Sequence, residues 1–173
     1  PPSPQTLALE GAGDTGTKAL SPAAPTAVVL VGGYNGFGVH TMYNVFRAFP
    51  GHFKNIVFVS VGVIDSGGFK GEDSIDRLRE ETQRVLDRYL ELARQLRIPA
   101  TARLAIGTDA VDEAENVCRE VAKEFPRATF FAGQVIFPRE SFLQRLLHNQ
   151  TAYAIQRRLQ LVGHNTVILP ARA

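Results

Sequence analysis

The sequence predicts a doubly wound α/β domain, in which helices cover both faces of a five-stranded parallel sheet. Two observations support this prediction. The strand-like runs are apolar throughout, as in 27–31 (AVVLV) and 55–64 (NIVFVSVGVI), and strands buried on both faces have this composition. Helix-like segments alternate with these runs through short connections, which favours parallel strands joined by crossover helices.

The elements are expected in a regular order along the chain. The strand at 27–31 enters a glycine-rich turn and a helix at 39–49, which Pro50 and Gly51 end. A more amphipathic strand at 101–106 belongs nearer a sheet edge. The remaining expected elements are strands at 55–64, 128–132 and 166–169 and helices at 73–97, 110–125 and 150–162, with a loop and a short helix ending at His148 before the last of these helices.

Capping residues mark two of the expected helix starts. Thr108 or Asp109 precedes the third helix, where a side-chain oxygen accepts hydrogen bonds from the first free amides. Asn149 is expected to cap the last helix in the same way, and Gly163 to follow that helix in the left-handed conformation.

Composition describes one ordinary globular domain. The chain has 173 residues, of which 45% are apolar and 21% charged, enough for a real core. It contains one cysteine, Cys118, so it forms no internal disulfide, and no Cys/His spacing indicates a metal site. Cys118 lies on an apolar helix face and is expected to be a buried small hydrophobe.

Residues 1–25 are expected to be a flexible linker ahead of the domain at 26–173. They are rich in Pro, Gly, Ala, Ser and Thr and have no periodic apolar face, so they bury too little surface to offset the cost of ordering. They also lack the charged and apolar regions of a signal peptide. A chain that opens on a linker suggests a piece of a longer protein.

The net charge of +2 hides an asymmetry, because residues 127–173 contain six arginines and one acid, Glu140. The simpler explanation is that solvated helix faces happen to differ in sign. The alternative is that the C-terminal third faces something anionic, such as phosphate, an acidic partner surface or lipid headgroups. Nucleic acid is not the expected partner, since no stripe of aromatic residues accompanies the arginines.

No set of residues supports an enzyme reading. The sequence has no nucleophile elbow, no P-loop and no zinc-protease motif, and its four histidines are scattered. The glycine turn is also a poor dinucleotide fingerprint, because Thr41 stands where the third glycine belongs. We therefore expect no catalytic residues, no metal and no cofactor, and an NAD-type oxidoreductase is disfavoured.

From Ala27 to Pro170 the chain resembles the universal stress protein domain. This resemblance implies an adenine-nucleotide-binding type of fold with strand order 3-2-1-4-5. It also implies a homodimer through the last strand, here Thr166, Val167, Ile168 and Leu169. The stretch 145–160, RLLHNQTAYAIQRRLQ, resembles more narrowly the cytosolic C-terminal domain of bacterial permeases of the amino acid–polyamine–organocation superfamily.

The resemblance also locates a degenerate nucleotide site. Nucleotide-binding members have an aspartate after the first strand, where this chain has Gly32 or Gly33. Their Gly-x2-Gly-x9-Gly-Ser/Thr run keeps here only its first glycine and the type of its last residue, and Ile136 replaces the second glycine. We expect weak ATP binding, with any anion held by the amides of Gln150 and Thr151 near Arg145. The residues named for this site are Gly32, Gly33, Gly36, Gly133, Arg145, Asn149, Gln150 and Thr151.

These observations predict a non-catalytic cytosolic regulatory or assembly domain of a permease of the amino acid transporter type. Its partner would be the transmembrane part of the same protein, at the cytoplasmic face of the bacterial inner membrane, and about a dozen transmembrane helices are expected ahead of Pro1. The alternative is a sensor of an adenine nucleotide (ATP, AMP or a cyclic dinucleotide) with the same fold.

Overall fold

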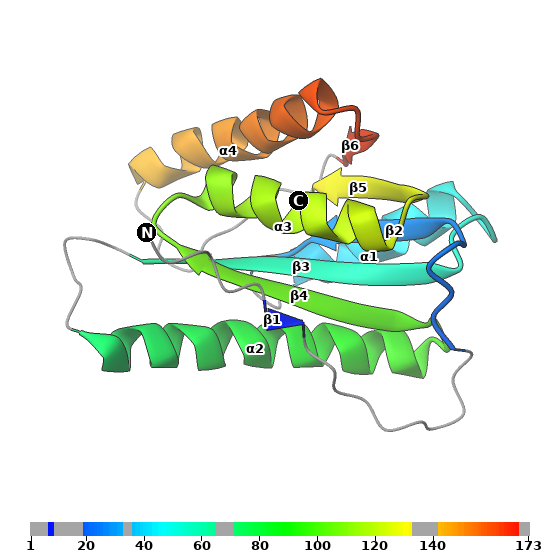
Figure 1. The fold of residues 1–173 in the computed structure, drawn as a ribbon, viewed down its shortest axis with the longest axis horizontal. Helices are drawn as coiled ribbons and strands as arrows, with labels where there is room; N and C mark the ends of the chain where they lie inside the picture. The colour runs from blue at the N-terminus through cyan, green and yellow to red at the C-terminus, as the bar shows by residue number, and fades with distance from the viewer. Residues whose placement is uncertain (1–6, 9–18, 33–35, 65–70, 133–141, 170–173) are drawn as a thin grey trace.

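The chain forms a six-stranded sheet with helices on both faces (Figure 1). In the computed structural model, the described residues are 7–8, 19–32, 36–64, 71–132 and 142–169. The strands are β1 (Leu7–Ala8), β2 (Thr26–Leu30), β3 (Asn55–Val63), β4 (Ala100–Gly107), β5 (Ala128–Ala132) and β6 (Thr166–Ile168). The helices are α1 (Gly36–Ala48), α2 (Glu72–Gln95), α3 (Ala110–Glu124) and α4 (Phe142–Leu161).

The sheet order is β1-β4-β3-β2-β5-β6, and every pair from β4 to β6 is parallel. Numbered among the five predicted strands, this is the order 3-2-1-4-5, so the predicted fold class is confirmed. The amphipathic strand β4 is the last of the parallel set, and β6 forms the opposite edge. β1 was not predicted. It pairs antiparallel with β4 through Leu7 and Leu104.

Two core clusters fill the space between the three layers. Alternate residues of β2 point to opposite faces. Val29 joins Met42 of α1 and Tyr89 of α2, whereas Val28 packs with residues of α3 and α4, among them Val117. The two clusters place α1 and α2 on one face of the sheet and α3 and α4 on the other. The sheet is therefore buried on both faces, as its apolar strands require.

The last helix begins earlier than its sequence suggests. α4 starts at Phe142 and continues through Asn149, so the prediction that Asn149 caps this helix is wrong. The segment 142–148 (FLQRLLH) contains neither Gly nor Pro, and nothing in it interrupts a helix. The predicted end is correct to one residue, since Gly163 follows α4 with φ 87°.

A buried amide holds the segment that leads into β2. Asn55 is 1% exposed; its side chain accepts a hydrogen bond from Ser21 N at 3.1 Å and donates to Ser21 O at 2.7 Å. It also donates to Thr26 Oγ1 at 3.0 Å. The packed part of the chain thus reaches Ser21, ahead of the domain boundary expected at residue 26.

Close packing explains one glycine of the turn before α1. A Cβ on Gly38 would overlap the hydroxyl group of Tyr89, which is fully buried and stacks on Phe58 with a centroid distance of 5.1 Å. Gly38 therefore lets α1 and α2 approach each other, a packing role rather than a phosphate-binding one.

Candidate functional site

The candidate site is the crevice at the carboxyl ends of the parallel strands. In doubly wound sheets ligands bind there, at the point where the strand order reverses. The reversal falls at β2, between β3 and β5. A pocket at this place lies between the sheet, α3 and α4, and its lining is Leu30, Val31, Val59, Val61, Ala110, Ala114 and Ile155.

The described pocket is small and apolar. Its volume is about 20 Å³, roughly the space of one water molecule. Small-molecule sites usually enclose about 300–1,000 Å³ and carry several polar groups aimed at the ligand. A purine ring would enter only if side chains of α3 or α4 moved.

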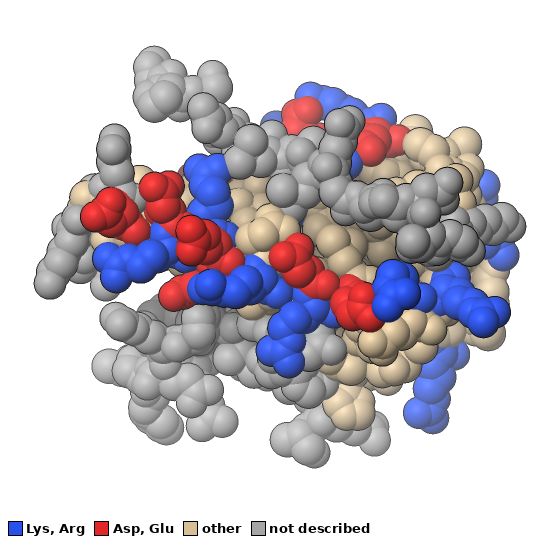
Figure 2. Space-filling view, turned by 90° about the horizontal axis from the view of Figure 1, so that it is seen from below, with Lys and Arg blue, Asp and Glu red and all other residues tan. Residues whose placement is uncertain are grey.

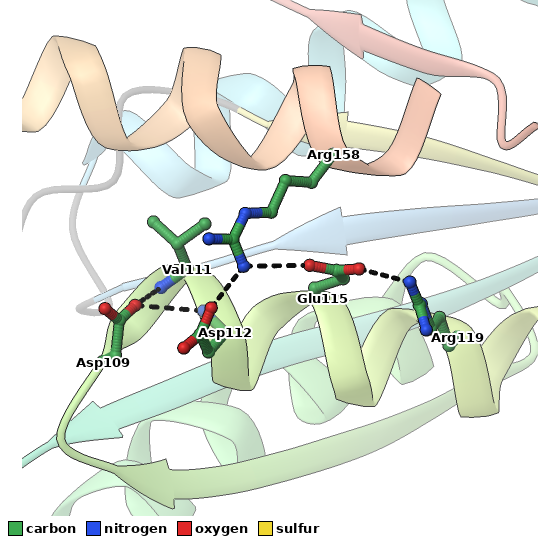
Figure 3. Close-up of polar contacts among 6 residues, drawn as sticks. All are labelled: Asp109, Val111, Asp112, Glu115, Arg119 and Arg158. Atoms are coloured by element: carbon green, nitrogen blue, oxygen red, sulfur yellow. Dashed lines mark hydrogen bonds and ion pairs between the residues drawn. The ribbon is translucent and has the colours of Figure 1, made fainter. Parts of the chain in front are cut away.

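The start of α3, beside this pocket, is strongly acidic. Asp109 accepts hydrogen bonds from Val111 N at 2.8 Å and Asp112 N at 3.0 Å, which confirms it as the predicted cap (Figure 3). These amides are the donors that an anionic ligand would otherwise use at a helix N-terminus. The cap thus occupies the anion site with a carboxylate of the protein itself.

Glu113 adds a carboxyl group that is partly removed from water. It lies over the backbone of Gly107, where a Cβ would overlap it. Burial raises the pKa of the Glu113 carboxyl above its ordinary value, and the nearby carboxylates of Asp112 and Asp109 raise it further. The backbone amides at the start of α3 thus bond only one of these three carboxyl groups, that of Asp109. This end of the crevice therefore carries excess negative charge.

One arginine of α4 bridges to these acids (Figure 3). The Nη1 atom of Arg158 donates to Asp112 Oδ1 and, at 3.1 Å, to Glu115 Oε2. Arg119 donates to the other oxygen of Glu115 at 2.5 Å. The network ties α4 to α3, and it neutralises one arginine of the basic C-terminal third internally. Sequence reasoning missed it because its partners lie more than 40 residues apart.

The structure describes the predicted nucleotide-site residues unevenly. Gly32 follows β2 at the mouth of the crevice and is half-buried, and Gly36 is the first residue of α1. Gly33 and Gly133 lie outside the described residues. For the remaining four the backbone belongs to α4, and their side chains lie outside the described ones: Arg145, Asn149, Gln150 and Thr151.

The position of two of these residues changes the predicted anion site. Only the first four amides of a helix lack an internal partner, and Gln150 and Thr151 lie well inside α4. An anion site made of free helix-terminal amides is therefore not formed at these two residues. A role for Arg145 near an anion stays a prediction.

At the predicted dimer edge, Thr166 is buried, and the next three residues are half-buried. Leu169 N donates to Ala132 O at 3.1 Å and extends the pairing of β6 with β5 by one residue.

Other chemistry that a site would need is not assembled in the described residues. Among them no group of three or more His, Cys, Asp or Glu side chains is arranged to hold a metal ion. Cys118 is fully buried, as predicted, and burial raises the pKa of its thiol well above the ordinary value. Within the same residues, no helix has the length and apolar character that a membrane span requires.

Comparison with known proteins finds the fold but not a sequence family. No protein-family model and no curated protein matches the chain. Among solved structures, a universal stress protein family member from Burkholderia pseudomallei matches with a TM-score of 0.55 and 18% identity, over 85% of this chain and 97% of that one. Universal stress protein UspA from Lactobacillus plantarum matches with a TM-score of 0.50 and 11% identity, over 85% and 99% of the two chains. The chain has the universal stress protein fold.

Proposed function

We propose that this chain is a non-catalytic regulatory or assembly domain of a bacterial permease of the amino acid–polyamine–organocation superfamily. Its partner would be the transmembrane part of the same protein, at the cytoplasmic face of the inner membrane. The observation that carries the proposal is the resemblance of 145–160 to permease tails. In support, the described residues of the crevice form a small apolar pocket beside the acidic start of α3, which is unfavourable for a nucleotide.

The electrostatics of the crevice favour this reading over a nucleotide sensor. The phosphates of ATP carry several negative charges, and a binding site normally meets them with free amides and cations. At the start of α3 the amides of Val111 and Asp112 are taken by Asp109. Arg158, the nearby cation, is taken by Asp112 and Glu115. A phosphate at the start of α3 would have to displace these internal partners.

The outer face of α4 offers a surface for assembly. Tyr153 is 60% exposed and Leu161 78% exposed. Both belong to or adjoin the stretch 145–160, which carries the resemblance to permease tails. We include these two side chains in the surface that would meet the membrane part.

A homodimer through β6 is part of the same proposal. Within the described residues β6 pairs with β5 and with no other strand, so one row of its backbone groups is available for pairing. Pairing with the same edge of a second copy would give a closed two-fold dimer. Ile168→Lys would place a charge at the edge and should shift sedimentation from dimer to monomer, whereas a wild-type monomer at high concentration would contradict the dimer.

Nucleotide titration is the direct test of the crevice. Isothermal calorimetry with ATP should give a dissociation constant of millimolar order or weaker, about −4 kcal/mol or less favourable. Micromolar binding would contradict the proposal and favour the adenine-nucleotide sensor.

The transporter assignment has a separate test in the intact gene. About a dozen transmembrane helices should be encoded ahead of Pro1. Deletion of residues 27–173 should change the rate or the regulation of transport while the membrane part still inserts. A gene that encodes only this domain and a few preceding codons would contradict the assignment, and a free-standing stress-type protein would replace it.

A further inference from the structure

Basic side chains gather at the amino-terminal end of the sheet, opposite the crevice. Since the crossovers are parallel, α1, α2 and α3 all end there. We define the basic end as the last turns of these helices with the connections after them, residues 45–54, 92–99 and 121–127. These segments contain six bases and one acid, all exposed: Arg47, Lys54, Arg94, Arg97, Lys123 and Arg127, with Glu124. Lys and Arg gather at the corresponding right-hand end of Figure 2.

The opposite end has the reverse charge. The first turns of α2 and α3 with their flanking residues, 72–76 and 108–115, contain seven acids and no base. The small net charge of +2 therefore conceals a separation of charge along the strands. A molecule with this distribution presents one end to a negatively charged surface and keeps the other end away from it.

Helix dipoles explain only half of the basic end. Cations in a last turn stabilise the helix C-terminus, and Arg47, Arg94 and Lys123 hold such positions. Arg94 and Lys123 also pair with acids one turn back, each at 2.6 Å. The remaining bases, Lys54, Arg97 and Arg127, follow the helices, and the dipole effect fades within the last turn.

The lone acid of the basic end is already paired. Glu124 accepts a hydrogen bond from Arg103 at 2.5 Å. The side chain of Arg103 is 10% exposed. Glu124 therefore compensates a largely buried arginine rather than one of the six exposed bases. The positive charge at the surface of this end is therefore not cancelled by Glu124.

Arg97 occupies a backbone position that suits glycine. Its φ is 57°; Arg97 N donates to Arg94 O at 3.0 Å and Ile98 N to Ala93 O at 2.9 Å, the two bonds of a Schellman motif. α4 ends in the same motif with Gly163 at the equivalent position. A side chain in this conformation strains the backbone. Glycine would therefore suit the helix cap at position 97 better than arginine does. The arginine contributes a positive charge instead.

We propose that the basic end is a docking surface for an anionic lipid bilayer. The six bases come from the ends of three helices and the connections after them. Lys54, Arg97 and Arg127 are exposed and have no acid partner among the described residues, so a plane of headgroups can meet these three together. Clusters of four to eight basic residues next to a membrane anchor are typical of attraction to acidic lipid. The choice of a bilayer as the partner depends on the proposed attachment to a permease. The separation of charge is observed in the structure and does not depend on that proposal.

The segment directly before β2 lies at the same end. Lys54 N donates to Pro25 O at 2.8 Å, and Thr26 N donates to Arg127 O at 3.1 Å. The segment that enters β2 therefore passes between two of the bases. A domain tethered through this segment presents its basic end toward its tether.

Vesicle binding by the 173-residue chain tests the proposal. The chain should co-sediment with vesicles of 70% phosphatidylcholine and 30% phosphatidylserine at 50 mM salt and not with pure phosphatidylcholine. Each neutralised base should weaken binding about fivefold, since a basic residue near the surface contributes about 1 kcal/mol. The combined variant Lys54→Gln, Arg97→Gly, Arg127→Gln should then bind about 100-fold more weakly. Arg157→Gln, an exposed base of α4, is the matched control and should bind like wild type.

Arg97→Gly separates a binding role from a structural one. It should raise the thermal midpoint by about 2 °C, because glycine relieves the left-handed backbone, and yet weaken vesicle binding about fivefold. Equal binding by wild type and the combined variant would overturn the proposal, as would tighter binding to duplex DNA than to the acidic vesicles. A gene without transmembrane helices would refute the permease assignment. The vesicle measurements would still decide whether the basic end binds acidic lipid.

Discussion

The two faces of the sheet are packed by different means. Against α1 and α2 the core uses large side chains, with Tyr89 stacked on Phe58 and fitted against Gly38. Against α3 the helix side chains that line the pocket are small, as in Ala114, although the rings of Phe125 and Phe130 also belong to this core. Close aromatic packing makes the first face depend on exact shape. On the second face, the small side chains of α3 leave room for the crevice pocket. There the ion pair between Arg158 and Asp112 helps to join α4 to α3.

The largest effect expected from this comparison is at Tyr89. Tyr89→Ala should lower the free energy of unfolding by about 3–5 kcal/mol, because it removes a fully buried ring and leaves a cavity. Urea denaturation measures the loss. Tyr89→Phe keeps the ring and is the matched control, with a much smaller loss expected. A loss below 1 kcal/mol for Tyr89→Ala would show that the α2 face is not held by aromatic packing.

A smaller effect is expected where α4 meets α3. Arg158→Ala should lower the free energy of unfolding only slightly and far less than Tyr89→Ala, since the guanidinium and Asp112 are both about half exposed and exposed ion pairs contribute little. The loss should shrink in 1 M salt, which screens exposed charges. Arg157→Ala is the control, because no ion pair joins Arg157 to another described residue. Equal losses for the two variants would contradict a role for the bridge.

The smallest effect concerns the pH dependence of the acidic end. The pKa of Glu113 is raised in the folded chain, so ionisation of this carboxyl costs more folded than unfolded. Its contribution is fully present below the unfolded pKa of about 4.3 and is lost as the pH rises through the folded pKa. Glu113→Gln should therefore match wild type near pH 3 and be more stable at pH 7, by no more than about 0.5 kcal/mol. A wild type that is the more stable of the two at pH 7 would contradict this sign.

Local signals predicted the elements of this fold well and failed where a boundary depended on context. β5 was predicted at its observed residues, because a strand buried on both faces is apolar along its whole length. The cap at Asp109 was also correct, since its bonds reach only two and three residues ahead. Asn149 resembles a cap just as closely, but α4 continues through it. A capping residue favours a helix start and does not impose one when the preceding residues are themselves helix formers.

The sequence by itself determined the class of fold, the order of its elements and the poor match of its glycine run to a nucleotide site, because composition, periodicity and spacing are local properties. Only the tertiary structure decided which basic side chains are paired with acids of the same chain and which are free to meet a partner. Arg158, from the arginine-rich third of the chain, is taken up by acids of α3, whereas bases scattered from Arg47 to Arg127 meet at one end of the sheet. They meet because parallel crossovers bring the ends of three helices to the same edge, an arrangement that no single stretch of sequence contains.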